Sequence, residues 1–106
     1  MSYRVSRDAQ RDLDEIFFYW AKRASLRVAD RLIDSITDRF WMLGGQPDGG
    51  RAAEDIAVGV RCFPAGKYLI DYRKTRRGID ILHVFHGAWD QKSAFNKGGK
   101  DSPRGC

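Results

Sequence analysis

The sequence predicts an α+β domain, with a short N-terminal strand and an antiparallel helical hairpin packed on a small antiparallel sheet. In the first half, two segments carry apolar residues at every third or fourth position, the spacing of one buried helix face. In the second half, three segments are rich in β-branched and aromatic residues and are separated by short turns. A glycine-rich break divides the halves, and a chain of 106 residues is most simply one domain.

The helical half follows a short candidate strand, YRVS at residues 3–6. Ser25 is placed to cap the second helix, because a serine side chain accepts a hydrogen bond from a free amide of the first turn. Lys22 to Ala24 leave only a tight turn, so the helices should fold back on each other. The expected buried stripes are Ala9, Leu13, Ile16, Phe17, Trp20 and Ala24 in the first helix, and Ala29, Leu32, Ile33, Ile36, Phe40 and Leu43 in the second.

The strand half follows GGQPDGG at residues 44–50, which cannot sustain a helix, and a loop is expected from there to Ile56. The strand segments are VGVRCF (58–63), KYLIDYRK (67–74) and GIDILHVF (78–85), joined by turns at PAG (64–66) and TRRG (75–78). Such short connections predict an antiparallel meander. We expect the domain to span residues 1–95 and the polar stretch 96–106 to be a disordered tail.

The strands can be paired by placing Phe63 opposite Tyr68 and Tyr72 opposite Ile81. This register puts Tyr72, His83 and Phe85 on one sheet face, and Val84 and His86 on the other. Both faces are then partly apolar, and a helical hairpin covers only one. The second face must therefore be sealed by the tail, a neighbouring molecule or a partner chain. A slip of one residue would exchange the two faces.

The net charge of +5 is concentrated in the second half, where residues 61–89 are net +4 and residues 90–106 net +2. Such a field attracts an acidic partner or nucleic acid, although an ordinary solvated surface gives the same count. No stretch approaches the ~20 apolar residues of a membrane span. The N-terminus has no apolar signal segment, and Cys62 and Cys106 fit no metal spacing. A cytoplasmic protein without membrane association is expected.

Little in the sequence indicates catalysis or a cofactor. His83 and His86 are three apart on a strand, so they point to opposite faces and are interpreted as structural. Asp8, Asp12 and Glu15 share one helix face, but arginines are interleaved with them, which is typical of a solvated, salt-bridged surface. No glycine loop has the setting of a phosphate cradle. Neither a cofactor nor a metal is therefore expected.

Basic residues around two strands and their turn are the more suggestive feature. They are accompanied by Tyr68 and Tyr72, and cations with stacking aromatics could hold RNA or stabilise a phosphoryl transition state. The alternative is that a turn reading TRRG is simply soluble. The basic residues are Arg61, Lys67, Arg73, Lys74, Arg76 and Arg77.

Five motifs in order give the chain a family resemblance. They are A..DL..I (Ala9, Asp12, Leu13, Ile16), A..LI..I (Ala29, Leu32, Ile33, Ile36), P..GR (Pro47, Gly50, Arg51), VR..PAG.YLI.Y (Val60 to Tyr72) and IL.V.HGAWD (Ile81 to Asp90). In this order the sequence resembles the ParE branch of the ParE/RelE toxin superfamily, the toxins of type II toxin–antitoxin modules. The resemblance covers about residues 3–90 and implies the same hairpin-on-sheet fold.

The resemblance also implies function and partners. Such toxins are held inactive by a cognate antitoxin that folds around them, and operator DNA is contacted only indirectly, through the antitoxin. ParE-like members usually poison DNA gyrase by binding, whereas RelE-like members cut messenger RNA on the ribosome. The positions used by the RNA-cutting branch fall here on Gly59, Arg61, Tyr68, Trp89 and Phe95. Only Arg61 keeps a suitable charge, and Phe95 has no hydroxyl, so the resemblance favours a non-enzymatic gyrase inhibitor.

Two alternatives stay open: a ribosome-dependent endoribonuclease that retains Arg61 as an electrostatic stabiliser, and a degenerate toxin that only binds its antitoxin. Trp89 departs from the family, which commonly has arginine there. The candidate target contacts are Arg61, Arg73, Arg76, Arg77 and Trp89. The candidate antitoxin contacts are Phe18, Tyr19, Tyr72 and Phe85.

Overall fold

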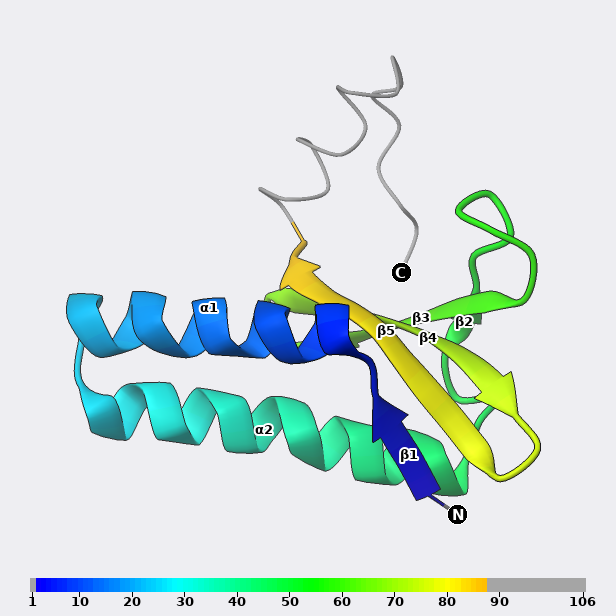
Figure 1. Cartoon of the computed structure of the whole chain (residues 1–106), viewed down its shortest axis with the longest axis horizontal. Helices are drawn as coiled ribbons and strands as arrows, with labels where there is room; N and C mark the ends of the chain where they lie inside the picture. Colours follow the sequence, from blue (N-terminus) through cyan, green and yellow to red (C-terminus); the bar gives the residue numbers. More distant parts are fainter. Residues whose placement is uncertain (1, 88–106) are drawn as a thin grey trace.

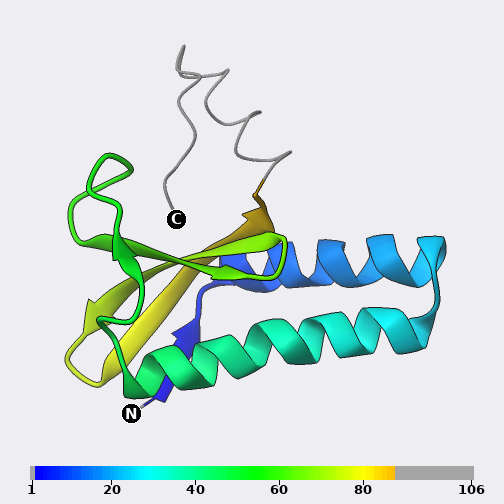
Figure 2. The same cartoon turned by 180° about the vertical axis from the view of Figure 1, so that it is seen from behind.

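The computed structural model describes residues 2–87 and has the predicted α+β architecture (Figure 1). Two long helices lie side by side on one face of a five-stranded sheet, and the view from behind shows the same arrangement (Figure 2). The elements in chain order are β1 (Ser2–Val5), α1 (Arg7–Arg23), α2 (Leu26–Gly45), β2 (Arg51–Ala52), β3 (Val60–Ala65), β4 (Tyr68–Thr75) and β5 (Gly78–His86).

The two helices begin at serine caps, as the sequence predicts for the second. The Ser25 hydroxyl accepts a hydrogen bond from the Val28 amide at 3.1 Å, and Ser6 does the same for Ala9 at 3.0 Å. Each bond satisfies a first-turn donor that has no partner within the helix. Helix α2 continues through the first two glycines of GGQPDGG and ends at Gly45. Contacts with the rest of the fold therefore outweigh the weak helix propensity of glycine at this end.

The sheet has the strand order β1-β5-β4-β3-β2 and is mixed (Figure 1). Strands β3, β4 and β5 form the predicted antiparallel meander. The N-terminal strand β1 pairs with β5 in parallel, from Ser2 opposite Gly78 to Val5 opposite Ile81. This parallel pairing was not predicted. A second addition is β2, which pairs with β3 inside the segment expected to be a loop.

The register differs from the expected one at two places. Tyr72 lies opposite Ile81 as predicted, but Phe63 lies opposite Ile70, a shift of two residues that leaves the faces unchanged. A β-bulge then places Asp71 opposite His83, so that β5 contains one extra residue, Leu82. Because side chains alternate along a strand, this residue exchanges the faces of everything after it.

The main core lies between the helices and the sheet, and a smaller one lies on the other face. Tyr72, Phe40, Ile36 and Ile81 are fully buried in the main core. Burying one such side chain contributes about 1.5–3 kcal/mol. The smaller core consists of Ala53, Val60, Cys62 and Leu69, with Leu82 and Phe85 packed against it. The bulge is the reason that Phe85 packs there and Val84 packs in the main core, the reverse of the expected faces.

The two ends of the molecule carry different connections between the helices and strands. The turn between α1 and α2 lies at one end, whereas the β2–β3 loop and the β4–β5 turn both lie at the other (Figures 1 and 2). Neither α1 nor α2 is long and apolar enough to cross a membrane. The expected tail, residues 96–106, lies outside the described residues.

Candidate interaction surfaces

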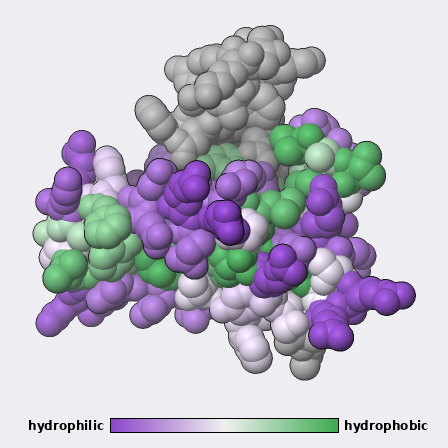
Figure 3. Space-filling model, in the orientation of Figure 1, coloured by the Kyte–Doolittle hydropathy of each residue, from purple (hydrophilic) through white to green (hydrophobic). Residues whose placement is uncertain are grey.

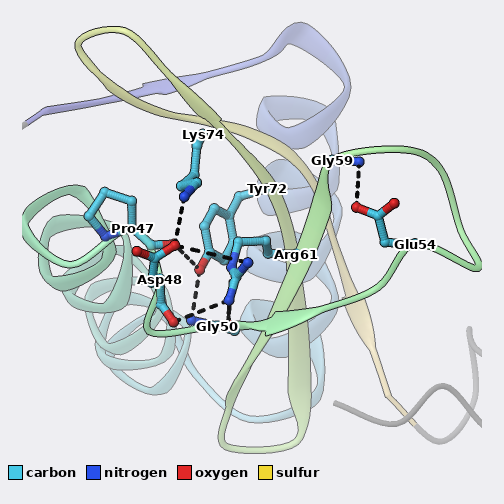
Figure 4. Close-up of polar contacts among 8 residues, drawn as sticks. All are labelled: Pro47, Asp48, Gly50, Glu54, Gly59, Arg61, Tyr72 and Lys74. Atoms are coloured by element: carbon cyan, nitrogen blue, oxygen red, sulfur yellow. Dashed lines mark hydrogen bonds and ion pairs between the residues drawn. The ribbon is translucent and has the colours of Figure 1, made fainter.

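Tyr72 connects the main core to the loop that follows α2. Its ring is fully buried, while its hydroxyl donates a hydrogen bond to the Pro47 carbonyl at 2.8 Å and accepts one from the Gly50 amide at 2.7 Å (Figure 4). Tyr72 was expected among the antitoxin contacts. The structure corrects this, because a fully buried side chain with both hydrogen bonds made inside the domain offers nothing to a partner.

Arg61 forms hydrogen bonds with the same loop. Its guanidinium donates from Nε and Nη2 to the Gly50 carbonyl at 3.1 and 2.6 Å, and from Nη2 to the Asp48 carbonyl at 3.3 Å (Figure 4). The Asp48 carboxylate lies at the limit of an ion pair, 4.0 Å away. Arg61 was expected at the target interface, and here most of its donors already have partners within the domain.

Lys74 also binds this loop. Its ammonium donates to the Asp48 carboxylate at 2.7 Å. The hydrogen bond and the positive charge of Lys74 hold the pKa of Asp48 below its ordinary value, slight burial opposes this, and Arg61 adds a smaller lowering effect. Because Asp48 is solvent-exposed, the pair contributes little to stability.

The cations at the β4–β5 turn are different, because their charges remain available. Arg73, Arg76 and Arg77 are all exposed. Arg73 donates from Nη2 to the Val58 carbonyl at 3.3 Å, which orients the guanidinium without neutralising it. Within residues 2–87, none of the three forms an ion pair within 4.0 Å. These three predicted target residues therefore gather at one end of the sheet, apart from Arg61, which points into the loop.

Two exposed aromatic side chains lie next to each other on α1. The side chains of Phe18 and Tyr19 are 62% and 49% exposed, and the Arg23 guanidinium lies 4.8 Å from the centre of the Tyr19 ring. Phe85, the remaining predicted antitoxin contact, is half-buried on the opposite sheet face and does not join them. Trp89 lies outside the described residues.

Beside these aromatics, a groove of about 750 Å³ opens between α1 and the adjoining parts of β4 and β5. The Trp20 indole nitrogen donates to the Tyr68 hydroxyl at 2.8 Å across its floor, and the His86 ring meets Tyr68 edge-on at 5.4 Å. No local pattern predicts this convergence, since Trp20 and Tyr68 are 48 positions apart in the chain. The groove is lined by Asp12, Glu15, Ile16, Tyr19, Trp20, Lys67, Tyr68, Val84 and His86.

Asp12 is a structural residue and not part of the solvated, salt-bridged face that its spacing predicted. Its carboxylate accepts a hydrogen bond from the Val84 amide at 2.9 Å, directly after the bulge, and lies 3.3 Å from Nδ1 of His83. The register places the two histidines on opposite faces, as predicted. Among residues 2–87, no three histidine, cysteine or acidic side chains come close enough together to hold a metal.

A family model described as the ParE toxin of the type II toxin–antitoxin system parDE matches residues 3–90 of the 106. The chain belongs to the ParE toxin family. It is 28% identical over 91 residues to Toxin ParE1 of Caulobacter vibrioides, which covers 86% of this chain and 94% of that protein. It is 30% identical over 89 residues to Toxin ParE1 of Mycobacterium tuberculosis, covering 83% and 91%.

A solved structure described as the chromosomal ParDE TA system from P. aeruginosa has the same fold. The TM-score is 0.71 at 22% sequence identity, and the match covers 81% of this ParE chain and 95% of that chain.

In this ParE toxin, residues of different sequence motifs form hydrogen bonds with one another. The hydroxyl of Tyr72, which ends VR..PAG.YLI.Y, binds the backbone of Pro47 and Gly50 in P..GR. Asp12 of A..DL..I accepts from Val84 of IL.V.HGAWD. Both contacts connect elements that are distant in the chain. The motif residues described here therefore maintain the fold, while the exposed arginines and aromatics lie mostly outside the motifs.

Proposed function

We propose that this ParE toxin inhibits DNA gyrase by binding it, without breaking a covalent bond, and that a cognate antitoxin neutralises it by docking on α1. The observation that carries the non-enzymatic part is the state of Arg61. It is the one position aligned with the RNA-cutting branch that keeps a suitable charge, and its guanidinium donates to the backbone of Asp48 and Gly50. A guanidinium engaged in this way is poorly placed to stabilise a phosphoryl transition state.

Tyr68 supports the same proposal. Its hydroxyl accepts from the Trp20 indole inside the domain, and the residue is buried. Gly59, another aligned position, has no side chain to offer. A general acid or base contributes about 10²–10⁴-fold to a rate, so these replacements would remove most of an RNA-cutting mechanism.

The antitoxin site that we propose combines Phe18, Tyr19 and the groove beside them. Ile16, Trp20 and Val84 give the groove apolar walls, and Asp12, Glu15 and Lys67 give it charged rims. Such a surface suits an antitoxin segment that folds on binding, with apolar side chains inserted and polar groups at the edges.

The target is tested with purified toxin in a gyrase supercoiling assay. Wild-type toxin should inhibit supercoiling at micromolar concentration, and added antitoxin should restore it. Unchanged supercoiling at micromolar excess would contradict the proposal. Primer extension on translated messages provides the comparison, since codon-phased cuts would indicate a ribosome-dependent endoribonuclease. Expression without growth arrest would indicate a toxin that only binds its antitoxin.

The antitoxin site is tested with Phe18→Ser/Tyr19→Ser, which removes the exposed aromatics of α1. Antitoxin affinity should fall at least tenfold, while inhibition of gyrase stays at the wild-type level. Trp41→Ser is the control, because Trp41 is also exposed, at 68%, but lies on α2, towards the other end of the hairpin. If the two variants bind antitoxin equally well, the proposed site is wrong.

A further inference from the structure

The β2–β3 loop, residues 53–59, presents apolar side chains to solvent next to the free arginines. Val58 is 82% exposed and Ile56 is 38% exposed. Hydrophobic surface gathers over this loop, and hydrophilic surface over the neighbouring β4–β5 turn (Figure 3). Exposed single apolar residues are common, but here two β-branched residues share one loop beside a cationic turn.

This loop is held in one shape by its own hydrogen bonds. The Ala53 amide donates to the Val60 carbonyl at 2.8 Å, which closes the base, and the Ile56 amide donates to the Ala53 carbonyl at 2.9 Å. The Glu54 carboxylate accepts from the Gly59 amide at 3.0 Å (Figure 4). A loop that is ordered before binding loses less conformational entropy when a partner arrives.

Arg73 connects the loop to the turn. Its guanidinium donates to the Val58 carbonyl, so the apolar tip and the first of the free cations are in direct contact. Arg76 and Arg77 follow in the turn and are exposed. We call residues 53–59 together with Arg73, Arg76 and Arg77 the loop–turn surface.

We propose that the loop–turn surface is where this toxin grips its target, and that the target presents an acidic protein surface with an apolar hollow for Ile56 and Val58. This inference deepens the proposed function and rests on it. Charge complementarity supports an acidic partner, because three arginines here lack carboxylate partners within residues 2–87. Arginine is also among the residues that dominate binding energy at protein interfaces.

The loop favours protein over nucleic acid as the partner. Single-stranded nucleic acid is usually held by aromatic side chains on which bases stack, and residues 53–59 contain none. Aliphatic side chains beside arginines fit a protein surface better.

The test compares two pairs of substitutions, each with a matched control. Ile56→Ser/Val58→Ser removes the apolar tip, and Leu26→Ser/Val28→Ser removes exposed aliphatic side chains at the start of α2. Arg76→Glu/Arg77→Glu reverses the cations of the turn, and Arg27→Glu/Arg31→Glu makes the same charge change on exposed α2 positions. All four act on exposed residues, and the midpoint of thermal unfolding verifies that each variant folds.

Both loop–turn variants should need at least tenfold more toxin for half-inhibition of gyrase and should lose growth arrest, while their α2 controls behave as wild type. The arginine variant should also weaken the salt dependence of inhibition. Antitoxin affinity should not change in the loop–turn variants, because α1 is untouched.

Growth arrest by Ile56→Ser/Val58→Ser at the wild-type level would overturn the inference, whatever the target is. If the wild-type toxin does not inhibit gyrase, the proposed function is contradicted. Growth arrest by Ile56→Ser/Val58→Ser would still test the inference in that case, because it does not depend on which target is bound. A single-stranded DNA or RNA oligonucleotide is the last probe. Equal binding by the wild type and Ile56→Ser/Val58→Ser, lost in Arg76→Glu/Arg77→Glu, would make nucleic acid the partner and overturn it as well.

Discussion

Tyr72 both fills the main core and holds a surface loop in place. Its ring fills the centre of the main core, and its hydroxyl bonds to two backbone groups of the loop after α2. A tyrosine can be buried so deeply because its one polar atom finds both a donor and an acceptor. The Tyr72 hydroxyl therefore fastens this loop, and with it the end of α2, to the core, in addition to the contacts that Arg61 and Lys74 make with the same loop.

Tyr72→Phe tests this dependence. The ring is retained, but the Gly50 amide loses its acceptor in a buried position, which should reduce the free energy of unfolding by about 1–3 kcal/mol. Tyr19→Phe is the control, since an exposed hydroxyl should matter by less than about 0.5 kcal/mol. Urea denaturation of both variants measures the difference. Equal stability of the two would show that water replaces the lost hydroxyl.

The sequence alone does not indicate which basic side chains already have partners within the domain and which remain available. Arg61, Lys74 and Arg77 are equally cationic in the sequence. In the structure, Arg61 donates to backbone carbonyls, Lys74 pairs with Asp48, and only Arg77 keeps its charge free of an ion pair among the described residues. The partners of Arg61 and Lys74 lie 11 to 26 positions away in a loop, so no local pattern could separate these roles.

At the level of elements, the two helices begin with the same residue but with different connections. Ser25 caps α2 from an exposed turn, and its side chain makes no other hydrogen bond within the described chain. Ser6 caps α1 and also donates to the Leu82 carbonyl of β5 at 3.1 Å. The start of α1 is therefore fastened to the sheet, whereas the start of α2 is not.

Ser6→Ala should consequently destabilise the protein more than Ser25→Ala. Either change removes a cap worth about 0.5–2 kcal/mol. The change at Ser6 also removes a hydrogen bond to β5 worth about 0.5–1.5 kcal/mol. We expect a difference of about 1 kcal/mol between the variants in chemical denaturation. Indistinguishable variants would mean that the bond to Leu82 contributes nothing.

Much of the fold could be predicted because its signals are local. The two apolar stripes, the Ser25 cap and the three strands of the meander each follow from residues within a few positions of one another. The bulge at Leu82 could not be predicted in this way, since no glycine or charge marks it. One unmarked residue then reversed the expected faces of Phe85 and Val84.

The candidate site was predictable to a smaller extent. Exposed aromatics on α1 and arginines in a turn follow from the pattern of the elements. The groove does not, because it forms where α1 passes over β4 and β5, and their relative placement is a property of the complete fold. The carboxylate of Asp12 shows the same limit: its spacing suggested a solvated face, and its partner lies 72 positions away.

On the scale of the whole molecule, β1 is the element that joins the end of α2 to the last strand of the sheet. Its first residue, Ser2, lies between Gly44 of α2 and Gly78 of β5. A Cβ at Gly44 would come within 3.0 Å of the Ser2 carbonyl oxygen, and one at Gly78 would overlap it. The two glycines allow helix, N-terminal strand and last strand to meet.

Gly78→Ala should displace β1. The overlap with Ser2 costs about 1–3 kcal/mol, and the backbone at φ +153°, which disfavours a side chain, adds about 1–3 kcal/mol. Gly66→Ala is the control, since Gly66 also has a positive φ, +63°, but its Cβ would meet nothing within 4 Å. Thermal unfolding should show the larger loss for Gly78→Ala, together with faster amide exchange in residues 2–5. A loss no larger than that of Gly66→Ala would contradict the close approach.

The pairing of β1 with β5 also has a consequence for timing. About 75 residues separate Ser2 from its partners in the sequence. A ribosome that adds roughly 5–20 residues per second therefore needs about 4–15 s to supply the last strand after the first. During the later part of that interval, both helices have been synthesised but the strand that completes the sheet has not. The sheet of the toxin therefore cannot be completed before β5 has been made, however early the helices form.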